Sequence, residues 1–249
     1  MTAMNLEPRL RWCNRDGIGI LSDESAAAAG LLLAFTNRCG GVSTRPFDSL
    51  NLAARVGDDP EAVEENRVRT ARAVGFDHER LALSRQVHGN ELKEVEPGDV
   101  GVVGEADGLV LRHPGPVAAI LTADCAPVVV WGEHGAAVLH GGWRGLAAGV
   151  IGAGAVAVQA SHAWIGPCIR ACCYEIGSEV IDAFRARGLP VTDENHVDPA
   201  AAAEAALVEA GVKKVGVASV CTACDPAYYS YRRDGLTGRQ GAFVALLQR

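Results

Sequence analysis

The chain has 249 residues, of which 49% are hydrophobic and 21% are charged, and its formal net charge is −7. These values are typical of a globular protein that buries a substantial core. An acidic chain lacks the basic surface that binds a nucleic-acid polymer, whereas nucleosides, sugars and other small ligands remain compatible with it.

The first 30 residues lack the charged start, apolar run and small-residue cleavage site of a secretory signal. The apolar run at 31–35 gives way to polar residues at once, so it is too short to cross a bilayer. We therefore expect a cytoplasmic protein with no membrane partner. Its eight cysteines do not indicate a disulfide scaffold in a chain this long, and we expect them to be mostly free thiols or metal ligands.

A helix is predicted to begin at Asp59-Pro60, which supplies a capping carboxylate and a proline at the first helical position. Glu61 suits the positive end of this helix, and Gly75 ends it. The alanine-rich segment 26–29 is either helix or filler. Further helices are expected over 144–160, about 178–187 and 200–210.

Short apolar runs between these helices predict strands at 31–35, 109–111, 117–121, 128–131, 136–139, 163–165, 215–220 and 242–247. Three of the runs follow one another between 116 and 140 with no room for a helix, which requires antiparallel or mixed sheet there. We predict an α/β (α+β-like) sandwich of mixed, partly antiparallel sheets flanked by helices. No break in composition divides the chain, so we expect one domain over 1–249, with about 1–20 as an N-terminal arm.

Three residues at the ends of these runs are candidate metal ligands: His88 in RQVHGN, Cys125 in TADCAP and His140 in LHGGWRG. Two imidazoles and one thiolate suit Zn²⁺ or copper. Three protein ligands leave a coordination position open, which is typical of a catalytic zinc site. We expect the other histidines to be surface or hydrogen-bonded residues: His78, His113, His134, His162 and His196.

Seven segments in one order resemble the YfiH/YlmD family, also known as the DUF152, laccase-domain or polyphenol oxidase family, which includes mammalian FAMIN. They are TNRCGGVSTRPFDSLNL (36–52), SRQVHGN (84–90), EADGLV (105–110), TADCAPVVV (122–130), AVLHGGWRG (137–145), IGPCIRACCYEIG (165–177) and SYRRDGLTGRQ (230–240). The resemblance implies a single-domain α/β sandwich and a zinc site formed by His88, Cys125 and His140. It also implies purine nucleoside phosphorylase activity, with adenosine deaminase and methylthioadenosine phosphorylase activities at the same site.

Ordinary chemistry is compatible with these activities. Phosphorolysis of a nucleoside needs a held phosphate and a stabilised leaving purine. Deamination needs an activated water, which a metal with an open position provides. The role of the metal in phosphorolysis stays open: it either polarises a ribose hydroxyl or only shapes the pocket. The sequence does not rank inosine, guanosine, adenosine and methylthioadenosine, nor does it indicate an oligomeric state.

Anion binding is expected from arginines and backbone N–H groups. Arg38 precedes a glycine-rich turn and is the first candidate for phosphate, with the tandem pair Arg232 and Arg233 next to an aromatic segment as the second. Arg144 stands at the start of a predicted helix, where an anion also binds. Additional candidates are Ser43 and Asn51 as hydrogen-bond partners, and Asp124, which either orients a histidine, transfers a proton or caps a strand.

Competing interpretations remain. A multicopper laccase is excluded because it needs about four coppers and on the order of ten histidines, and the chain has seven. A single copper in the His-Cys-His site is not excluded, since Cu²⁺ outcompetes Zn²⁺ for such ligands. A metal-free cysteine hydrolase would use Cys125 as nucleophile with His140 or His88 as base. A binding protein with a structural zinc is a third alternative. The pair Cys221 and Cys224 is a weak zinc signal by itself, so what it binds is left open.

Overall fold

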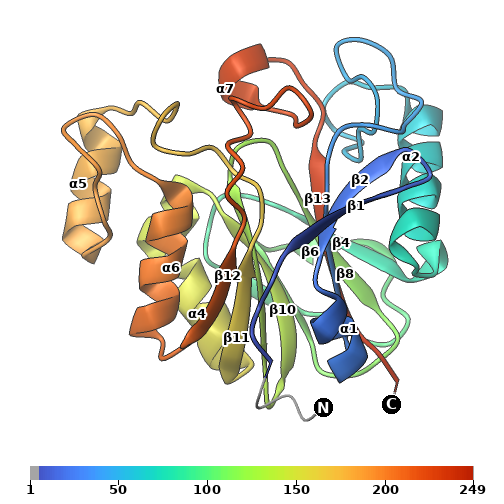
Figure 1. The fold of residues 1–249 in the computed structure, drawn as a ribbon, viewed down its shortest axis with the longest axis horizontal. Helices are drawn as coiled ribbons and strands as arrows, with labels where there is room; N and C mark the ends of the chain where they lie inside the picture. Colours follow the sequence, from blue (N-terminus) through green and yellow to red (C-terminus); the bar gives the residue numbers. More distant parts are fainter. Residues whose placement is uncertain (1–5, 249) are drawn as a thin grey trace.

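Two mixed β-sheets pack face to face and helices cover both outer sides, as Figure 1 shows. The structure is a computed structural model that describes residues 6–248. This architecture confirms the predicted α/β sandwich. None of the helices in that range is both long and apolar enough to cross a membrane.

Within residues 6–248, the first sheet has seven strands in the order β1-β2-β3-β13-β8-β4-β6. The pairs from β1 to β8 are antiparallel, and β8, β4 and β6 run parallel. The strand bounds are β1 Arg11–Arg15, β2 Ile18–Ser22, β3 Leu31–Thr36, β4 Leu81–Arg85, β6 Gly101–Glu105, β8 Val117–Thr122 and β13 Gln240–Leu246.

The second sheet has six strands over the same described range, in the order β12-β11-β9-β10-β7-β5. Its two outer pairs are parallel and its three inner pairs antiparallel. The bounds are β5 Leu92–Glu94, β7 Gly108–Leu111, β9 Ala126–Gly132, β10 Gly135–Gly141, β11 Ala160–Ile165 and β12 Lys214–Val217.

The helices are α1 Glu24–Ala29, α2 Pro60–Val74, α3 Trp143–Ala148, α4 Val150–Ala157, α5 Ser178–Arg187, α6 Pro199–Glu209 and α7 Tyr231–Asp234, with a 3₁₀ turn at His78–Arg80. The predicted α2 is confirmed together with both its caps, because Asp59 accepts a hydrogen bond from the Glu61 N–H and Gly75 adopts φ +94°. The helix expected over 144–160 is instead two short helices. Gly149, at φ +87°, ends α3 and begins α4.

Three apolar clusters hold the layers together. One fills the space between the two sheets and includes Ile120, Val138 and Trp164. A second joins the six-stranded sheet to α4, α5 and α6, and a third joins the seven-stranded sheet to α2. Burial of this apolar area is the main stabilising contribution to the sandwich.

The strands between 117 and 140 do not form a single meander. β8 belongs to the seven-stranded sheet, whereas β9 and β10 form an antiparallel hairpin in the other sheet. Residues 123–125 therefore carry the chain from one sheet to the other. This crossover contains the candidate ligand Cys125.

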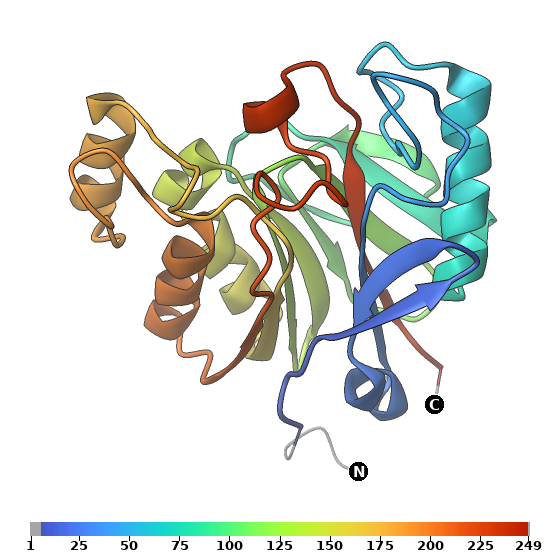
Figure 2. The ribbon, with the colours of Figure 1, turned by 45° about the horizontal axis from the view of Figure 1, so that its top comes forward.

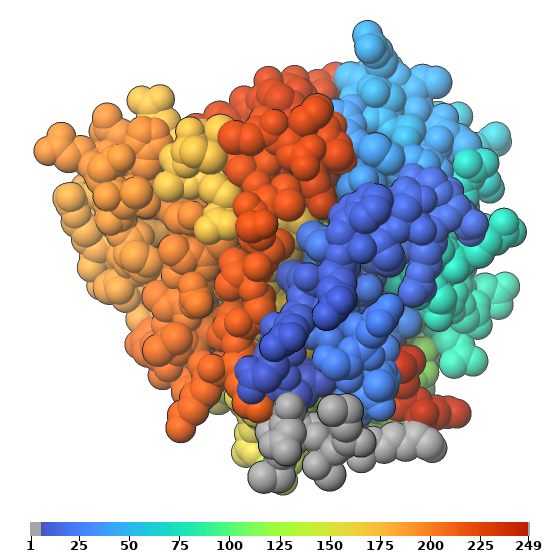
Figure 3. Space-filling model, viewed as in Figure 1, coloured from blue at the N-terminus to red at the C-terminus, as the bar shows by residue number. Residues whose placement is uncertain are grey.

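The N-terminal segment is part of the sandwich rather than a separate arm from Arg11 onward, because β1 and β2 form an edge hairpin of the seven-stranded sheet. Residues 6–10 run beside β12, as Figure 3 shows along the front face. Lys214 Nζ donates to the Leu6 carbonyl at 3.0 Å, and a Cβ on Gly216 would lie 3.0 Å from Pro8. The rest of the predicted arm, residues 1–5, lies outside the described residues.

Candidate active site

Three different connections bring His88, Cys125 and His140 together at one end of the strands. His88 follows β4, Cys125 lies on the crossover between the sheets, and His140 is the penultimate residue of β10. Their ligand atoms all lie within 4.8 Å of one another. The two imidazole rings meet edge to face, with centroids 4.7 Å apart. We call these three residues the triad.

The backbone around the triad is bent into conformations that L-residues rarely adopt. His88 has φ +60°, and Asp124, which precedes Cys125 in the chain, has φ +92°. Such positions cost on the order of 1–3 kcal/mol and persist only where surrounding contacts impose them. At His88 those contacts come from one buried carboxylate, Asp107.

Asp107 lies just before β7 and is fully buried. Its carboxylate accepts hydrogen bonds from the backbone N–H groups of Val87 (3.1 Å), His88 (3.0 Å) and Gly89 (2.7 Å). The same carboxylate lies 2.7 Å from His140 Nδ1. A single side chain therefore shapes the His88 turn and orients the His140 ring, as carboxylates behind metal-binding histidines do.

These contacts set the charges of the site. Burial opposes ionisation of Asp107, but its hydrogen bonds with His140 and the Gly89 N–H lower the pKa of this carboxyl. Burial also opposes protonation of His140, yet the neighbouring Cys125 and Asp107 raise the pKa of this imidazole to about 9. With Nδ1 held by Asp107, Nε2 is the His140 atom that faces the other two ligands. Burial and the charge of His140 lower the pKa of His88, which favours the neutral imidazole.

The donors fit a zinc ion in a three-ligand site. Neutral imidazole and thiolate are the ligand forms that zinc takes, and Asp107 supplies the outer carboxylate. Gly142 leaves the room that the ligands occupy, because a Cβ there would lie 2.6 Å from His88 Nδ1 and 3.5 Å from Cys125 Sγ. The same donors also suit copper.

Two cavities meet at the triad, and His88, Ala123, Cys125 and Tyr231 line both. The larger has a volume of about 450 Å³ and the smaller about 300 Å³. Figure 2 shows α7, which carries Tyr231, at the top of the molecule above the ends of the strands. The triad therefore lies where two adjoining cavities meet.

Four arginines of the described residues 6–248 line the larger cavity: Arg55, Arg67, Arg85 and Arg239. Gln86 and His140 line it as well. Arg67 and Arg239 are half-buried, and burial lowers the pKa of both guanidinium groups. Arg67 donates to the Leu52 carbonyl, Arg239 donates to the Thr237 and Gly238 carbonyls, and Arg85 pairs with Glu105. This cavity has the charge of an anion site.

Aromatic rings line the smaller cavity. Trp143, Tyr174 and Tyr231 contribute to it together with Arg144 and Arg232. The Arg144 guanidinium lies 4.1 Å from the centre of the Trp143 ring, and that of Arg232 lies 5.0 Å from the Tyr174 ring. Tyr231 is 62% exposed, so its ring is free to stack against a ligand.

Two of the arginines predicted to bind phosphate, Arg144 and Arg232, therefore lie at the site. The first candidate for phosphate, Arg38, lies outside both cavities. Its guanidinium pairs with Asp48 at 3.3 Å and Asp234 at 3.7 Å and stacks on Tyr229. Arg233 is also turned away, since it donates to the backbone carbonyls of Thr222, Ala223, Asp225 and Tyr228.

Ser43 and Asn51 lie outside both cavities as well. Both are buried and both hydrogen-bond to Asp58, at 2.6 and 2.8 Å. Asn51 Oδ1 also accepts the backbone N–H of Arg239 at 2.9 Å. These residues hold the loop beneath Arg239, which is a role in support of the site.

The side chain of Asp124 bonds to Thr222 and Arg232 rather than to a triad histidine, and the carboxylate behind His140 is Asp107. The two oxygens of Asp124 accept the Thr222 hydroxyl and the Arg232 backbone N–H, both at 2.7 Å. Asp124 lines the smaller cavity and connects the crossover to α7. Asp107 and Arg239 lie in segments that carry the family resemblance, but neither residue is recognisable from the sequence as part of the site.

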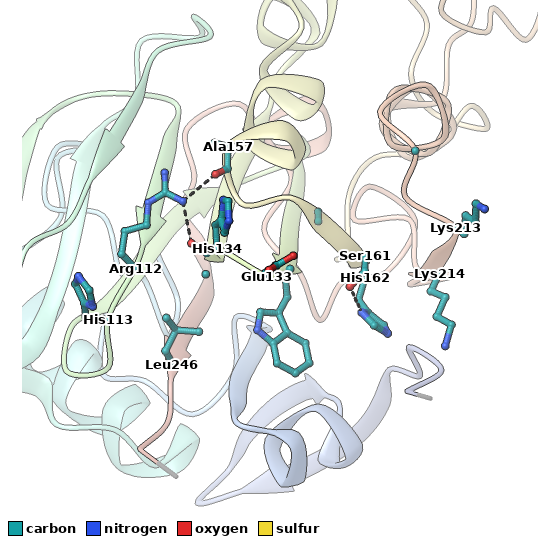
Figure 4. A pocket seen from close by; sticks show the side chains of 15 residues that line it. Arg112, His113, Glu133, His134, Ala157, Ser161, His162, Lys213, Lys214 and Leu246 are labelled. Atoms are coloured by element: carbon teal, nitrogen blue, oxygen red, sulfur yellow. Dashed lines mark hydrogen bonds between the residues drawn. The ribbon is translucent and has the colours of Figure 1, made fainter. Parts of the chain in front are cut away.

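A larger cavity, of about 1060 Å³, lies elsewhere. It lies around the β9–β10 turn, at the far ends of the strands whose other ends carry Cys125 and His140. Figure 4 shows that Arg112 at its wall is already hydrogen-bonded to the backbone of His134 and Ala157, and that Ser161 and His162 bond each other. Size alone does not mark the active site here.

Known proteins resemble this chain over most of its length. A family model described as multi-copper polyphenol oxidoreductase laccase matches residues 32–247. Purine nucleoside phosphorylase YfiH of Escherichia coli (strain K12) is 36% identical over 233 residues, which cover 88% of this chain and 95% of that protein. A purine nucleoside phosphorylase of Deinococcus radiodurans is 40% identical over 235 residues, covering 87% and 89%. This chain belongs to the YfiH laccase-domain family.

Family membership is also evident in the fold. The crystal structure of YlmD from Geobacillus stearothermophilus matches with a TM-score of 0.88 at 32% identity, over 97% of this chain and 100% of that one. The crystal structure of the Bacillus licheniformis protein YfiH matches with a TM-score of 0.86 at 27% identity, over 95% and 98%.

The laccase description does not fit a multicopper cluster in this chain. The chain has seven histidines, and the three-ligand site uses two of them. His162 is buried with its ring nitrogens on Ser161 and the Leu6 carbonyl, while His78 and His196 pair with carboxylates. The histidines are dispersed, so they do not supply the ligands that several coppers need.

Proposed function

We propose that this protein is a zinc-dependent purine nucleoside phosphorylase, acting on inosine, guanosine, adenosine or methylthioadenosine, with adenosine deaminase activity at the same site. The observation that carries the proposal is the position of the triad, where an arginine-lined cavity meets an aromatic one. The two substrates differ in the same respect, because phosphate is an anion that arginines bind and a nucleoside carries an aromatic base that stacks on aromatic rings. The relatives named as purine nucleoside phosphorylases support the reaction class.

Phosphate would bind in the larger cavity. Arg239 and Arg67 are half-buried there, and water screens a half-buried guanidinium less than an exposed one. Their contacts with backbone carbonyls fix the two side chains before phosphate arrives, so little ordering is needed on binding. Arg55 adds positive charge at the exposed side of the same cavity, whereas the charge of Arg85 is matched by Glu105.

The purine would bind in the smaller cavity, where the exposed Tyr231 ring offers a stacking surface beside Trp143 and Tyr174. Because the two cavities join at the triad, the ribose and its glycosidic bond would lie between base and phosphate. Holding both reactants across this junction lowers the entropic barrier to their reaction.

His88, Cys125 and His140 would hold the zinc. When bound, the ion would supply a Lewis acid with an open coordination position at the junction of the cavities. Asp107 keeps the His140 ring in the orientation that ligation needs. Copper in the same ligands would be the alternative occupant, with a weak polyphenol oxidase activity as its consequence.

Asp124 would act as a positioning residue. Both of its oxygens already accept hydrogen bonds, so it holds α7 and the segment around Thr222 over the smaller cavity rather than taking up a proton. Eight free thiols, one of them a proposed ligand, suit the reducing environment of the cytoplasm, where we expect the protein to act.

The test is phosphate-dependent release of hypoxanthine from inosine by zinc-loaded protein, with the metal content measured on the same sample. Cys125→Ala should lose both the triad metal and phosphorolysis, whereas Cys39→Ala, at an exposed cysteine outside both cavities, should keep both. Conversion of adenosine to inosine without phosphate measures the deaminase separately. Phosphorolysis that survives removal of the metal and of Cys125 would contradict the proposal.

One observation favours a second candidate, a cysteine hydrolase. Cys125, His140 and Asp107 lie in the order nucleophile, base and orienting carboxylate, with His140 Nδ1 2.7 Å from Asp107. Metal-free protein that is alkylated at Cys125 by an amide-mimicking electrophile, and that hydrolyses amides but not inosine, would establish this reaction instead.

A further inference from the structure

A second cluster of thiols lies outside the triad. Among residues 6–248, Cys172, Cys173, Cys221 and Cys224 place their Sγ atoms within 4.8 Å of one another. The Cys224 Sγ lies 3.6 Å from that of Cys172 and 3.3 Å from that of Cys173. All four are free thiols. We call them the four-cysteine cluster.

The spacing of this cluster matches a tetrahedral metal site better than it matches disulfides. With Zn–S bonds of about 2.3 Å, the sulfurs of a zinc tetrathiolate lie roughly 3.8 Å apart. A disulfide would need a separation of about 2.05 Å, much shorter than the contacts present. Four sulfurs at tetrahedral spacing would accept one ion with small side-chain movements.

The backbone of both segments also suits thiolate ligands. Cys221 and Cys224 form a C-x-x-C turn, and the Arg170 N–H donates to Cys221 Sγ at 3.4 Å. Cys168 and Cys221 form an isolated parallel bridge that fixes the two segments side by side. The vicinal pair at 172–173 then faces the turn.

Two arginines contact the segments of this cluster, and Arg232 provides counter-charge. A zinc ion with four thiolates has a net charge of −2, which is unfavourable at a protein surface unless cations lie near. Arg233 donates to the carbonyls of Thr222 and Ala223, inside the C-x-x-C turn, at 3.0 and 3.3 Å, but its charge is matched by Asp234 at 2.7 Å. Arg232 donates to the Cys173 carbonyl at 3.4 Å. Each of the two cysteine-bearing segments therefore carries a guanidinium.

We propose that Cys172, Cys173, Cys221 and Cys224 bind a second Zn²⁺ ion in a closed, four-thiolate structural site. The ion would join the segment after β11 to the segment after β12. Both segments are connected to the active site, because Thr222 donates to Asp124 and Arg232 lies on α7 beside the smaller cavity. The second zinc would thus brace one wall of that cavity without contacting substrate.

Metal content distinguishes this site from the triad. After reconstitution with zinc under reducing conditions, the wild-type chain should bind about two ions, because each site takes one. Cys221→Ser/Cys224→Ser should lose one ion, and His88→Ala/Cys125→Ala should lose the other. Cys13→Ser/Cys39→Ser removes the same number of thiols elsewhere and should keep both ions.

Cobalt substitution identifies the ligands. The ion retained by His88→Ala/Cys125→Ala should show strong thiolate-to-cobalt charge transfer and the visible bands of a tetrahedral four-sulfur site. Cys221→Ser/Cys224→Ser should lose these bands and unfold at a lower temperature than the Cys13→Ser/Cys39→Ser control. Serine is close in size to cysteine, and retained triad metal in that variant would show that it still folds.

The proposal is overturned if the wild-type chain binds one ion that only the triad variant loses. It is also overturned if peptide mapping of reduced, zinc-loaded protein shows disulfides among the four cysteines. Neither result depends on phosphorolysis, so the four-cysteine site stands or falls separately from the proposed activity.

Discussion

Asp107→Asn is the substitution that examines the site most directly, because one buried carboxylate serves both histidines of the triad. It keeps the size of the side chain and removes its charge. The Asp107 oxygens face four donors: the N–H groups of Val87, His88 and Gly89, and the His140 Nδ1. An amide has one oxygen and one NH₂ group, so the NH₂ group, itself a donor, would face two of these four donors.

The magnitude follows from which donors lose their acceptor. Oδ2 accepts from Val87 and Gly89, and Oδ1 serves His88 and His140. Either orientation of the amide therefore leaves two donors unmatched in a fully buried place. At about 1–3 kcal/mol for each unsatisfied donor, the metal-free protein should lose about 2–6 kcal/mol of stability. Loss of the outer carboxylate should also weaken zinc binding about 10–100-fold.

Both quantities are measurable on one pair of proteins. Urea unfolding of metal-free protein gives the stability change, and competition with a chromogenic chelator gives the zinc affinity. Asp182→Asn, at an exposed position of α5, removes the same charge and should change neither. Wild-type zinc affinity together with wild-type stability in Asp107→Asn would refute the role assigned to this carboxylate.

Further predictions test the cavity, the phosphate site and a distant part of the fold. Gly142→Ala should displace a triad histidine, since its Cβ would lie 2.6 Å from His88 Nδ1, and should lower zinc content and inosine phosphorolysis at least about tenfold. The control Gly152→Ala should leave both unchanged, because no atom would lie within 4 Å of its added Cβ. Arg239→Gln should raise the KM for phosphate by about 10–100-fold, with a smaller effect on the KM for inosine. Arg38→Gln should lower the melting temperature and leave the KM for phosphate unchanged. If both variants raised the KM for phosphate equally, Arg239 would not be the phosphate-binding residue. Asp23→Asn should destabilise the protein by about 1–3 kcal/mol at neutral pH. Burial opposes ionisation of Asp23, but hydrogen bonds from Arg9, Ser25 and Trp164 lower the pKa of this carboxyl below its ordinary 3.8. The stabilisation is therefore present above pH 3.8 and is lost as pH falls through the pKa of the folded protein. Unfolding curves from pH 7 to 3 should show the two proteins converging, and a constant difference would count against it.

The sequence predicts elements whose signals are local. The α2 helix is recognised because its cap, its first-turn proline and its terminal glycine are all adjacent in the chain. The edge strands β1, β5 and β6 are missed, because an exposed edge needs no apolar alternation. The inner strands β2 and β4 are missed as well, because their apolar runs are short. The sequence also does not predict that β8 and β9 belong to different sheets, because two apolar strands joined by a short loop have the same sequence pattern in one sheet or in two.

The same distinction applies to the site. His88, Cys125 and His140 stand out because histidine and cysteine carry ligand chemistry in the residue itself. Arg38 also stood out locally, but its charge is used by Asp48 and Asp234. Arg239 lies at the cavity with no local signal, since its place is set by Asn51, far away in the sequence. Whether an arginine binds a ligand depends on which carboxylates reach it first, and that is a property of the fold.

Two carboxylates, Asp107 and Asp124, hold together the chain segments that form the site. Asp107 ties the loop after β4 to the end of β10, and Asp124 ties the crossover to α7. Each connects segments from different parts of the chain, and each is accompanied by a residue in left-handed backbone conformation, His88 and Asp124 itself. The strain is tolerated because buried, charge-assisted hydrogen bonds outweigh it. Relaxing either turn would separate one wall of the site from the triad, so the bent backbone and the buried carboxylates act as one unit.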